Sequence, residues 1–234
     1  MVDGGLFFKT KDERTIYLNT SVTHLERFGL VIGWNFRNQY PISYTEVMAK
    51  QDINPWKTLD SEIVYKNPHI TFRKDTVSNP AGKPGEYGIV ERSGGVFIVA
   101  MAADHSVCLI RQFRYPVQAS TWEVPAGGID GTENKLEAAQ RELAEEAGFE
   151  ADSWESLGTF FPAPGYSIEP AYVFLAQGLR DVMYEGGDAD ERIESKRFFS
   201  LKEVAGLMQS DTPFDGPTIT AISMACVKLG LKIE

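Results

Sequence analysis

The chain has 234 residues, 43% of them hydrophobic, so it is long enough for one domain with a sizeable core, alone or with an extension. Its formal charge of −10 argues against a surface for nucleic acid or anionic membrane, because either needs clustered Lys and Arg. No apolar stretch is long enough to cross a bilayer, and the start, MVDGGLFFKT, lacks the basic-then-apolar order of a secretory signal. We therefore expect a cytoplasmic protein with no nucleic-acid or membrane partner.

Residues 1–56 are predicted to form an N-terminal extension, and residues 57–234 the main domain. The extension mixes short aromatic and β-branched runs (LFF, TIYLNT, GLVIGW) with one predicted helix near SYTEVMAKQD, bounded by Pro41 and Pro55. Its residues indicate no role.

From Ser61 the pattern changes to strands. EIVYKNPHITFRKDTV predicts a hairpin that turns at Asn67 and Pro68, and GIVERSGGVFIVAM and SVCLIRQFRYPV are expected to be further strands. Beyond the middle of the chain, strands are predicted at SLGTFFP, AYVFLAQGL and SKRFFS, with the acidic loop YEGGDADERIE before the last.

Three helices are predicted in the main domain: Thr132 to Ala147, one beginning at Leu201, and one from about Pro217 to Leu229. Gly148 closes the first in the position that a helix C-cap prefers. Strands and helices interleave without a regular βαβ rhythm, which favours an α+β fold. Cys108 and Cys226 lie far apart in apolar runs, without metal-ligand spacing, and are expected to be buried free thiols.

The first predicted helix carries Glu142, Glu145 and Glu146 within five positions. On a helical wheel Leu136 and Leu143 lie within about 20° of each other, and the three glutamates fall together on the far side, which predicts an acidic cluster that points out of the core. A solvated helix face is the alternative, but such faces usually interleave both signs of charge. Carboxylates that converge at one helical turn are what Mg²⁺ needs, since it prefers hard oxygen ligands.

The same helix lies inside a longer motif. The pattern G-x5-E-x7-R-E-U-x-E-E-x-G-U, with U a bulky apolar residue, is filled at every fixed position over 23 residues. This match resembles the Nudix box, and it consists of Gly127, Glu133, Arg141-Glu142-Leu143, Glu145-Glu146 and Gly148-Phe149.

The resemblance implies the Nudix fold, a mixed β-sheet sandwiched between α-helices, and a hydrolase that cleaves a nucleoside diphosphate linked to another moiety. Carried over by position, Glu142 and Glu146 are expected to be the main Mg²⁺ ligands, with Mn²⁺ as a substitute. Glu145 is expected to be a third or water-bridged ligand that also takes part in catalysis, and the backbone carbonyl of Ala126 a further ligand.

Two charged residues of the motif are expected to support the metal site or the chemistry. Arg141 would orient the glutamates, because its fixed guanidinium fork holds a carboxylate in one geometry. Glu133 is left open between a catalytic role and a first-turn carboxylate favoured by the helix dipole.

Pro164 stands sixteen residues beyond Gly148 in FPAPGYSIEPAYVFLA, followed by Gly165 and by Glu169. This placement resembles the ADP-ribose pyrophosphatase branch of the family, and implies that these three residues contribute to substrate binding. The loop departs from the branch because a second acid often precedes the glutamate there.

The run RQFRYPVQASTWEVPAGGID resembles the same branch's strand and turn before the box. It makes Arg111 and Arg114 candidates to hold the diphosphate or the terminal ribose. Glu123 is expected near the metals or as a residue that orders the neighbouring loop. The alternative for Arg114 is an ordinary exposed strand charge.

In that branch the N-terminal strands help to form a homodimer and supply aromatic residues that sandwich the base. A homodimer is therefore expected here, although the first 55 residues align with nothing in the branch. Four aromatic residues could stack on a base, with core or hairpin roles as the alternative: Trp34, Trp56, Phe72 and Tyr87.

Hydrolysis of a phosphoanhydride also needs a group that removes a proton from water. The resemblance favours Glu191 in the acidic loop, with Asp188, Asp190 and Glu194 as rivals and a merely solvated loop as the alternative. An EF-hand is excluded, because Arg192 would occupy a ligand position.

The resemblance implies a Mg²⁺-dependent hydrolase of ADP-ribose or a related nucleoside diphosphate sugar, with AMP and ribose 5-phosphate as the products expected from ADP-ribose. Two alternatives stay open: a hydrolase of another nucleotide sugar, such as GDP-mannose or ADP-glucose, and a sensor that binds a nucleotide without cleaving it. The complete glutamate set argues against the sensor.

Overall fold

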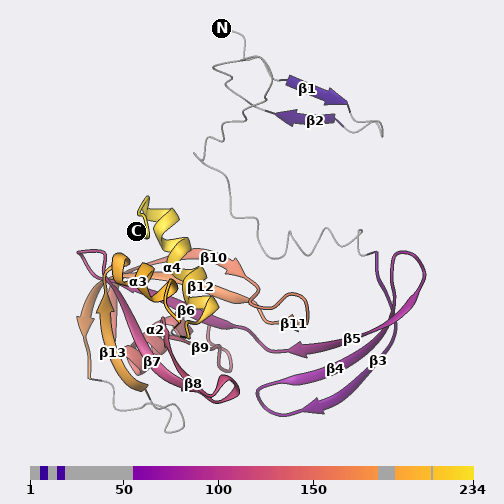
Figure 1. Ribbon diagram of the computed structural model, residues 1–234, viewed down its shortest axis with the longest axis horizontal. Helices are drawn as coiled ribbons and strands as arrows, with labels where there is room; N and C mark the ends of the chain where they lie inside the picture. The colour runs from indigo at the N-terminus through magenta and orange to yellow at the C-terminus, as the bar shows by residue number, and fades with distance from the viewer. Residues whose placement is uncertain (1–5, 10–14, 19–54, 184–192, 212) are drawn as a thin grey trace. The chain divides into compact units, whose positions relative to one another are not determined.

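The computed structural model describes residues 6–9, 15–18, 55–183, 193–211 and 213–234 (Figure 1). The chain divides into two compact units, residues 1–42 and 43–234. In the first, β1 (Leu6–Lys9) and β2 (Thr15–Leu18) form an antiparallel pair. The helix predicted near SYTEVMAKQD and the aromatic candidate Trp34 lie outside the described residues.

The second unit contains a four-stranded sheet in the order β11-β5-β4-β3. Its strands are β3 (Lys57–Lys66), β4 (Thr71–Ser78), β5 (Pro84–Glu91) and β11 (Ser167–Ile168). The predicted hairpin at Asn67 is confirmed, since β3 and β4 pair antiparallel. Asn67 Oδ1 accepts hydrogen bonds from the backbone N–H groups of His69 and Ile70, which closes the turn.

A seven-stranded sheet forms the centre of the same unit. It has the order β10-β12-β6-β7-β13, with β8 paired to β7 and β9 paired to β6. Strand β12 runs parallel to β6 and the other pairs are antiparallel, so the sheet is mixed. The strands are β6 (Gly95–Met101), β7 (Val107–Arg114), β8 (Ala119–Glu123), β9 (Ala126–Gly128), β10 (Phe149–Phe160), β12 (Ala171–Asp181) and β13 (Ile193–Phe199).

Two predicted strands are divided in the structure. GIVERSGGVFIVAM contributes to two different sheets, because Gly94 adopts φ +88 between β5 and β6. The end of SVCLIRQFRYPV leaves the strand for a short 3₁₀ helix, η2 (Tyr115–Val117), where a proline cannot continue the ladder.

The three predicted helices are α2 (Lys135–Ala147), α3 (Leu201–Met208) and α4 (Gly216–Leu229). Helix α2 begins three residues later than predicted, because Asn134 caps it and forms a capping box with Glu137. Gly148 ends it in the left-handed conformation at φ 62. Within the described residues, no helix combines the length and the apolar content needed to span a bilayer.

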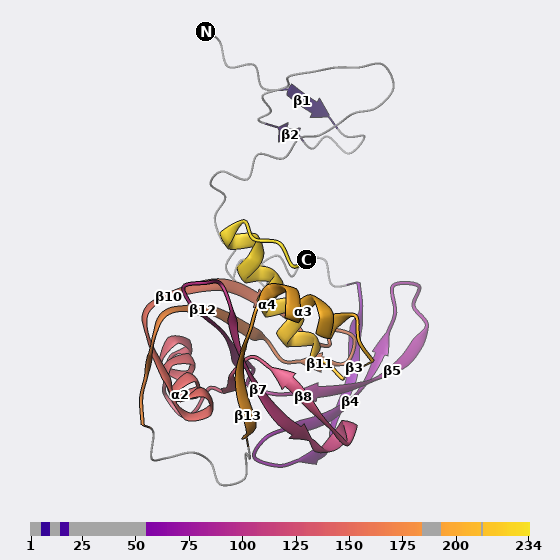
Figure 2. The same cartoon turned by 60° about the vertical axis from the view of Figure 1, so that its left-hand side comes forward.

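The central sheet lies between helices, because its middle strands alternate between two cores. In β6, Ile98 packs with one apolar cluster and Val99 with the other. Helix α2 covers the first cluster, and α3 and α4 cover the second, so they lie on opposite faces of the sheet (Figure 2). The expected α+β sandwich is confirmed. Both thiols, Cys108 and Cys226, are buried and free as expected.

Candidate functional site

Helix α2 buries Leu143 and Ala147 as the wheel predicted, but two other positions differ from the prediction. Leu136 is 37% exposed, whereas Glu142 is only 6% exposed. The prediction that Leu136 belongs to the core face and that all three glutamates point away from it is wrong. Leu136 lies in the first turn of the helix, beyond the buried residues of the α2 core, and Glu142 turns toward β9.

The Glu142 carboxylate lies directly against the backbone of Gly127 in β9. A Cβ atom at position 127 would stand 2.0 Å from Glu142 Oε1 and 2.1 Å from its carboxyl carbon. Only glycine leaves room for this approach, which explains sterically why the first position of the motif is a glycine. A buried carboxylate is costly unless it is paired, and the neighbouring guanidinium supplies that partner.

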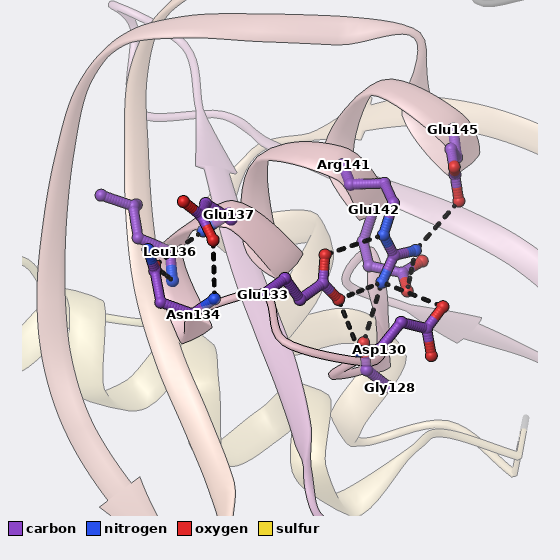
Figure 3. A network of polar contacts seen from close by, with 9 residues as sticks. All are labelled: Gly128, Asp130, Glu133, Asn134, Leu136, Glu137, Arg141, Glu142 and Glu145. Atoms are coloured by element: carbon purple, nitrogen blue, oxygen red, sulfur yellow. Dashed lines mark hydrogen bonds and ion pairs between the residues drawn. The ribbon is translucent and has the colours of Figure 1, made fainter.

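Arg141 joins three acidic residues of the motif, Glu133, Glu142 and Glu145 (Figure 3). Its Nη1 donates to Glu142 Oε1 at 2.7 Å and to Glu145 Oε2 at 3.1 Å. Its Nη2 donates to Glu133 Oε1 at 2.8 Å and to the Gly128 carbonyl at 3.0 Å. One guanidinium therefore spans the helix, the residue before its cap and β9, as a planar fork with five donors can do.

Glu133 holds the other side of this guanidinium. Its Oε2 accepts from Arg141 Nε at 3.2 Å, and its Oε1 also accepts from the Asp130 backbone N–H at 2.6 Å. The hydrogen bond from Arg141 holds the pKa of Glu133 below its usual range. Glu133 precedes the Asn134 cap, so its place is set by Arg141 and the turn at Asp130.

Glu146 ties the helix to β9 at a second point, because its Oε2 accepts from the Ala126 backbone N–H at 2.7 Å. Ala126, the predicted carbonyl ligand, therefore lies beside the glutamates. Across the described ranges, no three Asp, Glu, His or Cys side chains converge on one point as metal ligands would. In this arrangement Arg141 engages Glu142 and Glu145. The donors available are carboxylate and carbonyl oxygens, which suit Mg²⁺ by type.

A cleft of about 660 Å³ opens beside β9. Its lining includes all three residues of β9, the β5–β6 connection, the end of β7 and the segment Pro213–Pro217 before and within α4. Because β9 also contacts α2 through Glu142 and Glu146, a molecule in the cleft would lie next to the strand that the glutamates touch.

Arg114 and Glu123 line the cleft as a bidentate pair. Arg114 Nε and Nη2 donate to the two Glu123 oxygens at 2.9 and 2.6 Å. Glu123 is 4% exposed, and the Thr121 hydroxyl donates to it as well. Arg114 is therefore not a solvated strand charge, since a buried carboxylate fixes it at the cleft.

Of the other residues predicted to bind substrate, only Glu169 is among the described residues that line the cleft. Glu169 lines the cleft and pairs with Arg92 at 2.8 Å. Pro164 and Gly165 lie exposed in the turn before β11. Arg111 pairs with Glu194 at 3.5 Å, and Ser120 also donates to Glu194 at 2.9 Å, but Arg111 is not among the described residues that line the cleft. Glu191, Asp188 and Asp190 lie outside the described residues.

Among the charged residues that line the cleft, sequence reasoning missed Arg92 and Asp215. Arg92 follows β5 directly, and its position two residues before Gly94 was the available signal. Asp215 precedes α4 and caps it, and the sequence analysis did not single it out. Of the aromatic candidates, Trp56 and Tyr87 contact each other edge to face with ring centroids 5.4 Å apart, and Phe72 is 36% exposed.

Comparisons with known proteins found matching family models and relatives. A family model described as NUDIX domain matches residues 91–222, and one described as nucleoside diphosphate sugar hydrolase N-terminal domain matches residues 56–90. The chain is 28% identical to the methanol dehydrogenase activator of Bacillus methanolicus, over 75% of this chain and 95% of the relative. It is 30% identical to the ADP-ribose pyrophosphatase of Bacillus subtilis (strain 168), over 76% of this chain and 96% of the relative.

Among solved structures, one described as an ADP compounds hydrolase superposes with a TM-score of 0.65. It is 23% identical, and the alignment covers 75% of this chain and 94% of that one. At that identity the likeness concerns the fold.

Proposed function

The chain belongs to the Nudix family of hydrolases, and from that membership we propose that it is a Mg²⁺-dependent enzyme that hydrolyses the diphosphate of ADP-ribose to AMP and ribose 5-phosphate. The observation that carries the proposal is the Arg141 network, which binds Glu133, Glu142 and Glu145 beside a cleft that contains two arginines.

The glutamates of α2 fit the proposed metal by their chemistry. Glu142, Glu145 and Glu146 offer only oxygen donors from one helical turn, and Ala126 adds a backbone carbonyl on the strand that Glu146 contacts. When bound there, Mg²⁺ would neutralise the charge that develops on the diphosphate oxygens. Arg141 orients the ligands, because its hydrogen bonds fix the side chains of Glu142 and Glu145.

The cleft arginines account for substrate binding in the proposal. Arg114 presents a guanidinium held rigid by Glu123, and Arg92 presents one paired with Glu169. Such forks match diphosphate oxygens. Glu191 remains the proposed base that takes a proton from water, and Glu145 assists it. Arg111 pairs with Glu194, and we assign it a role in holding that part of β13 and not in contacting the substrate.

The substrate class rests on two findings. The match of residues 56–90 to the N-terminal domain of nucleoside diphosphate sugar hydrolases favours a nucleotide sugar, and the B. subtilis relative is named for ADP-ribose. GDP-mannose and ADP-glucose are the rival substrates, since the glutamate helix determines the chemistry and not the sugar. A sensor without activity is the weaker alternative, because every acidic position of the motif is filled.

We also propose that the enzyme is a homodimer that uses β3. All ten residues of this edge strand are exposed, and they include four large apolar side chains: Leu59, Ile63, Val64 and Tyr65. A long apolar edge strand is a template for pairing with another chain unless it is covered.

The test of the activity is a substrate panel with purified protein and Mg²⁺, read by chromatography. ADP-ribose should give AMP and ribose 5-phosphate faster than ADP-glucose, GDP-mannose and dinucleotide polyphosphates are cleaved. Faster cleavage of another nucleotide sugar would make that compound the proposed substrate and leave the proposed diphosphate hydrolysis unchanged. Tight binding to one compound with no cleavage of any would favour the sensor.

A further inference from the structure

The segment Pro213–Pro217 forms a wall of the cleft that belongs neither to the motif nor to the loop before β11. Phe214 forms a parallel β-bridge with Trp122 of β8. The Thr218 hydroxyl, which is fully buried, accepts a hydrogen bond from the Val124 backbone N–H at 3.0 Å. These two contacts fix the wall to β8 and to Val124, the residue that follows it, so the wall is preorganised for a ligand.

Asp215 is the charged side chain of this wall. Its Oδ2 accepts from the Thr218 backbone N–H at 2.8 Å and thereby caps α4. An ionised carboxylate offers about four acceptor sites, and the cap uses only some of them. Burial, more than the nearby Glu123 carboxylate, raises the pKa of the Asp215 carboxyl.

The described lining of the cleft has more carboxyl groups than guanidinium groups, unlike a site that binds only phosphate. Its described lining contains two guanidinium groups, Arg92 and Arg114, and three carboxyl groups, Glu123, Glu169 and Asp215. Each arginine is paired with one glutamate. Asp215 is the surplus carboxyl, and a surplus carboxylate repels a further phosphate but accepts hydrogen bonds from hydroxyl groups.

We infer that Asp215 is a specificity-determining residue that accepts a hydrogen bond from a hydroxyl of the substrate's non-nucleoside sugar. The inference rests on the proposed function, since it assigns the neutral, hydroxyl-bearing half of a nucleotide sugar to the wall formed by Pro213–Pro217. It explains how one cleft receives both a diphosphate, at its arginines, and a sugar hydroxyl, at Asp215.

The test compares ADP-ribose with the ethyl ester of ADP, which has the diphosphate but no second sugar. Asp215→Ser keeps a good helix cap, because Ser is as effective there as Asp, and it withdraws the carboxylate from the cleft. We expect kcat/KM for ADP-ribose to fall about tenfold relative to kcat/KM for the ester, the scale of one lost hydrogen bond to a charged group. Asp215→Asn, which keeps an acceptor, should recover part of the ratio.

Asp211→Ser is the matched control, since Asp211 is exposed and lies outside the cleft lining. Equal loss for both substrates in Asp215→Ser would overturn the inference and leave the proposed function standing. If the wild type cleaves neither compound, the proposed function fails. Calorimetric binding of ADP-ribose and of ADP, without metal, then decides the inference. A preference for ADP-ribose that Asp215→Ser abolishes would support it, and an unchanged preference or no binding would overturn it.

Discussion

The carboxylate of Glu142 occupies the place where a side chain at Gly127 would stand, because a Cβ atom there would lie 2.0 Å from Glu142 Oε1. Gly127 and Glu142 therefore depend on each other sterically, although fifteen positions separate them in the chain. Helix α2 can approach β9 only while position 127 has no side chain.

Gly127→Ala is therefore expected to displace Glu142 and to lower kcat for ADP-ribose by about 100-fold, the scale of an ångström-sized misplacement in a catalytic site. Gly128→Ala is the matched control, since a Cβ at 128 meets nothing within 4 Å. Steady-state kinetics with thermal unfolding of both variants check this. Equal activity of the two alanine variants would contradict the steric role.

Arg141→Lys is expected to weaken the apparent Mg²⁺ affinity by about 10- to 100-fold, the usual effect of losing a residue that orients metal ligands. Lysine keeps the charge but cannot hold Glu133, Glu142 and Glu145 at once with a single ammonium group. The measurement is kcat as a function of Mg²⁺ concentration. Arg180→Lys, in an exposed pair with Asp152, should leave that curve unchanged.

Much of this site could be predicted from the sequence, because its residues are close together along the chain. The helix, its Gly148 cap and the acidic cluster follow from local patterns, and Arg141 was expected to orient the glutamates. The burial of Glu142 could not be predicted from the sequence, because it depends on β9 packing against α2. Arg92 and Asp215 were missed for the same reason, since they meet at the cleft from strands and loops far apart in the chain.

Ile63→Lys tests the proposed dimer, because it places a charge at the centre of the exposed β3 edge. We expect a dimer for the wild type and a monomer for this variant in size-exclusion chromatography with light scattering. Val227→Lys introduces the same charge at an 84% exposed position of α4 and should leave the dimer intact. A monomeric wild type would refute the proposal.

Neither thiol is expected to react in the folded protein. Burial raises the pKa of the Cys108 thiol to about 12, and burial also raises the pKa of Cys226. At pH 8 both groups are then protonated, and the thiol form is a poor nucleophile. Ellman's reagent should titrate two thiols only after denaturation. Rapid modification under native conditions would show that one of these positions opens to solvent.

The central claim is that the glutamates of α2 bind divalent ions, which in turn bind a diphosphate. Its most direct test is a crystal structure with Mn²⁺ and the α,β-methylene analogue of ADP-ribose, read by anomalous scattering. We expect manganese against Glu142 and Glu146 with the diphosphonate beside Arg114. A bound analogue with no anomalous peak along that helical turn would contradict the account.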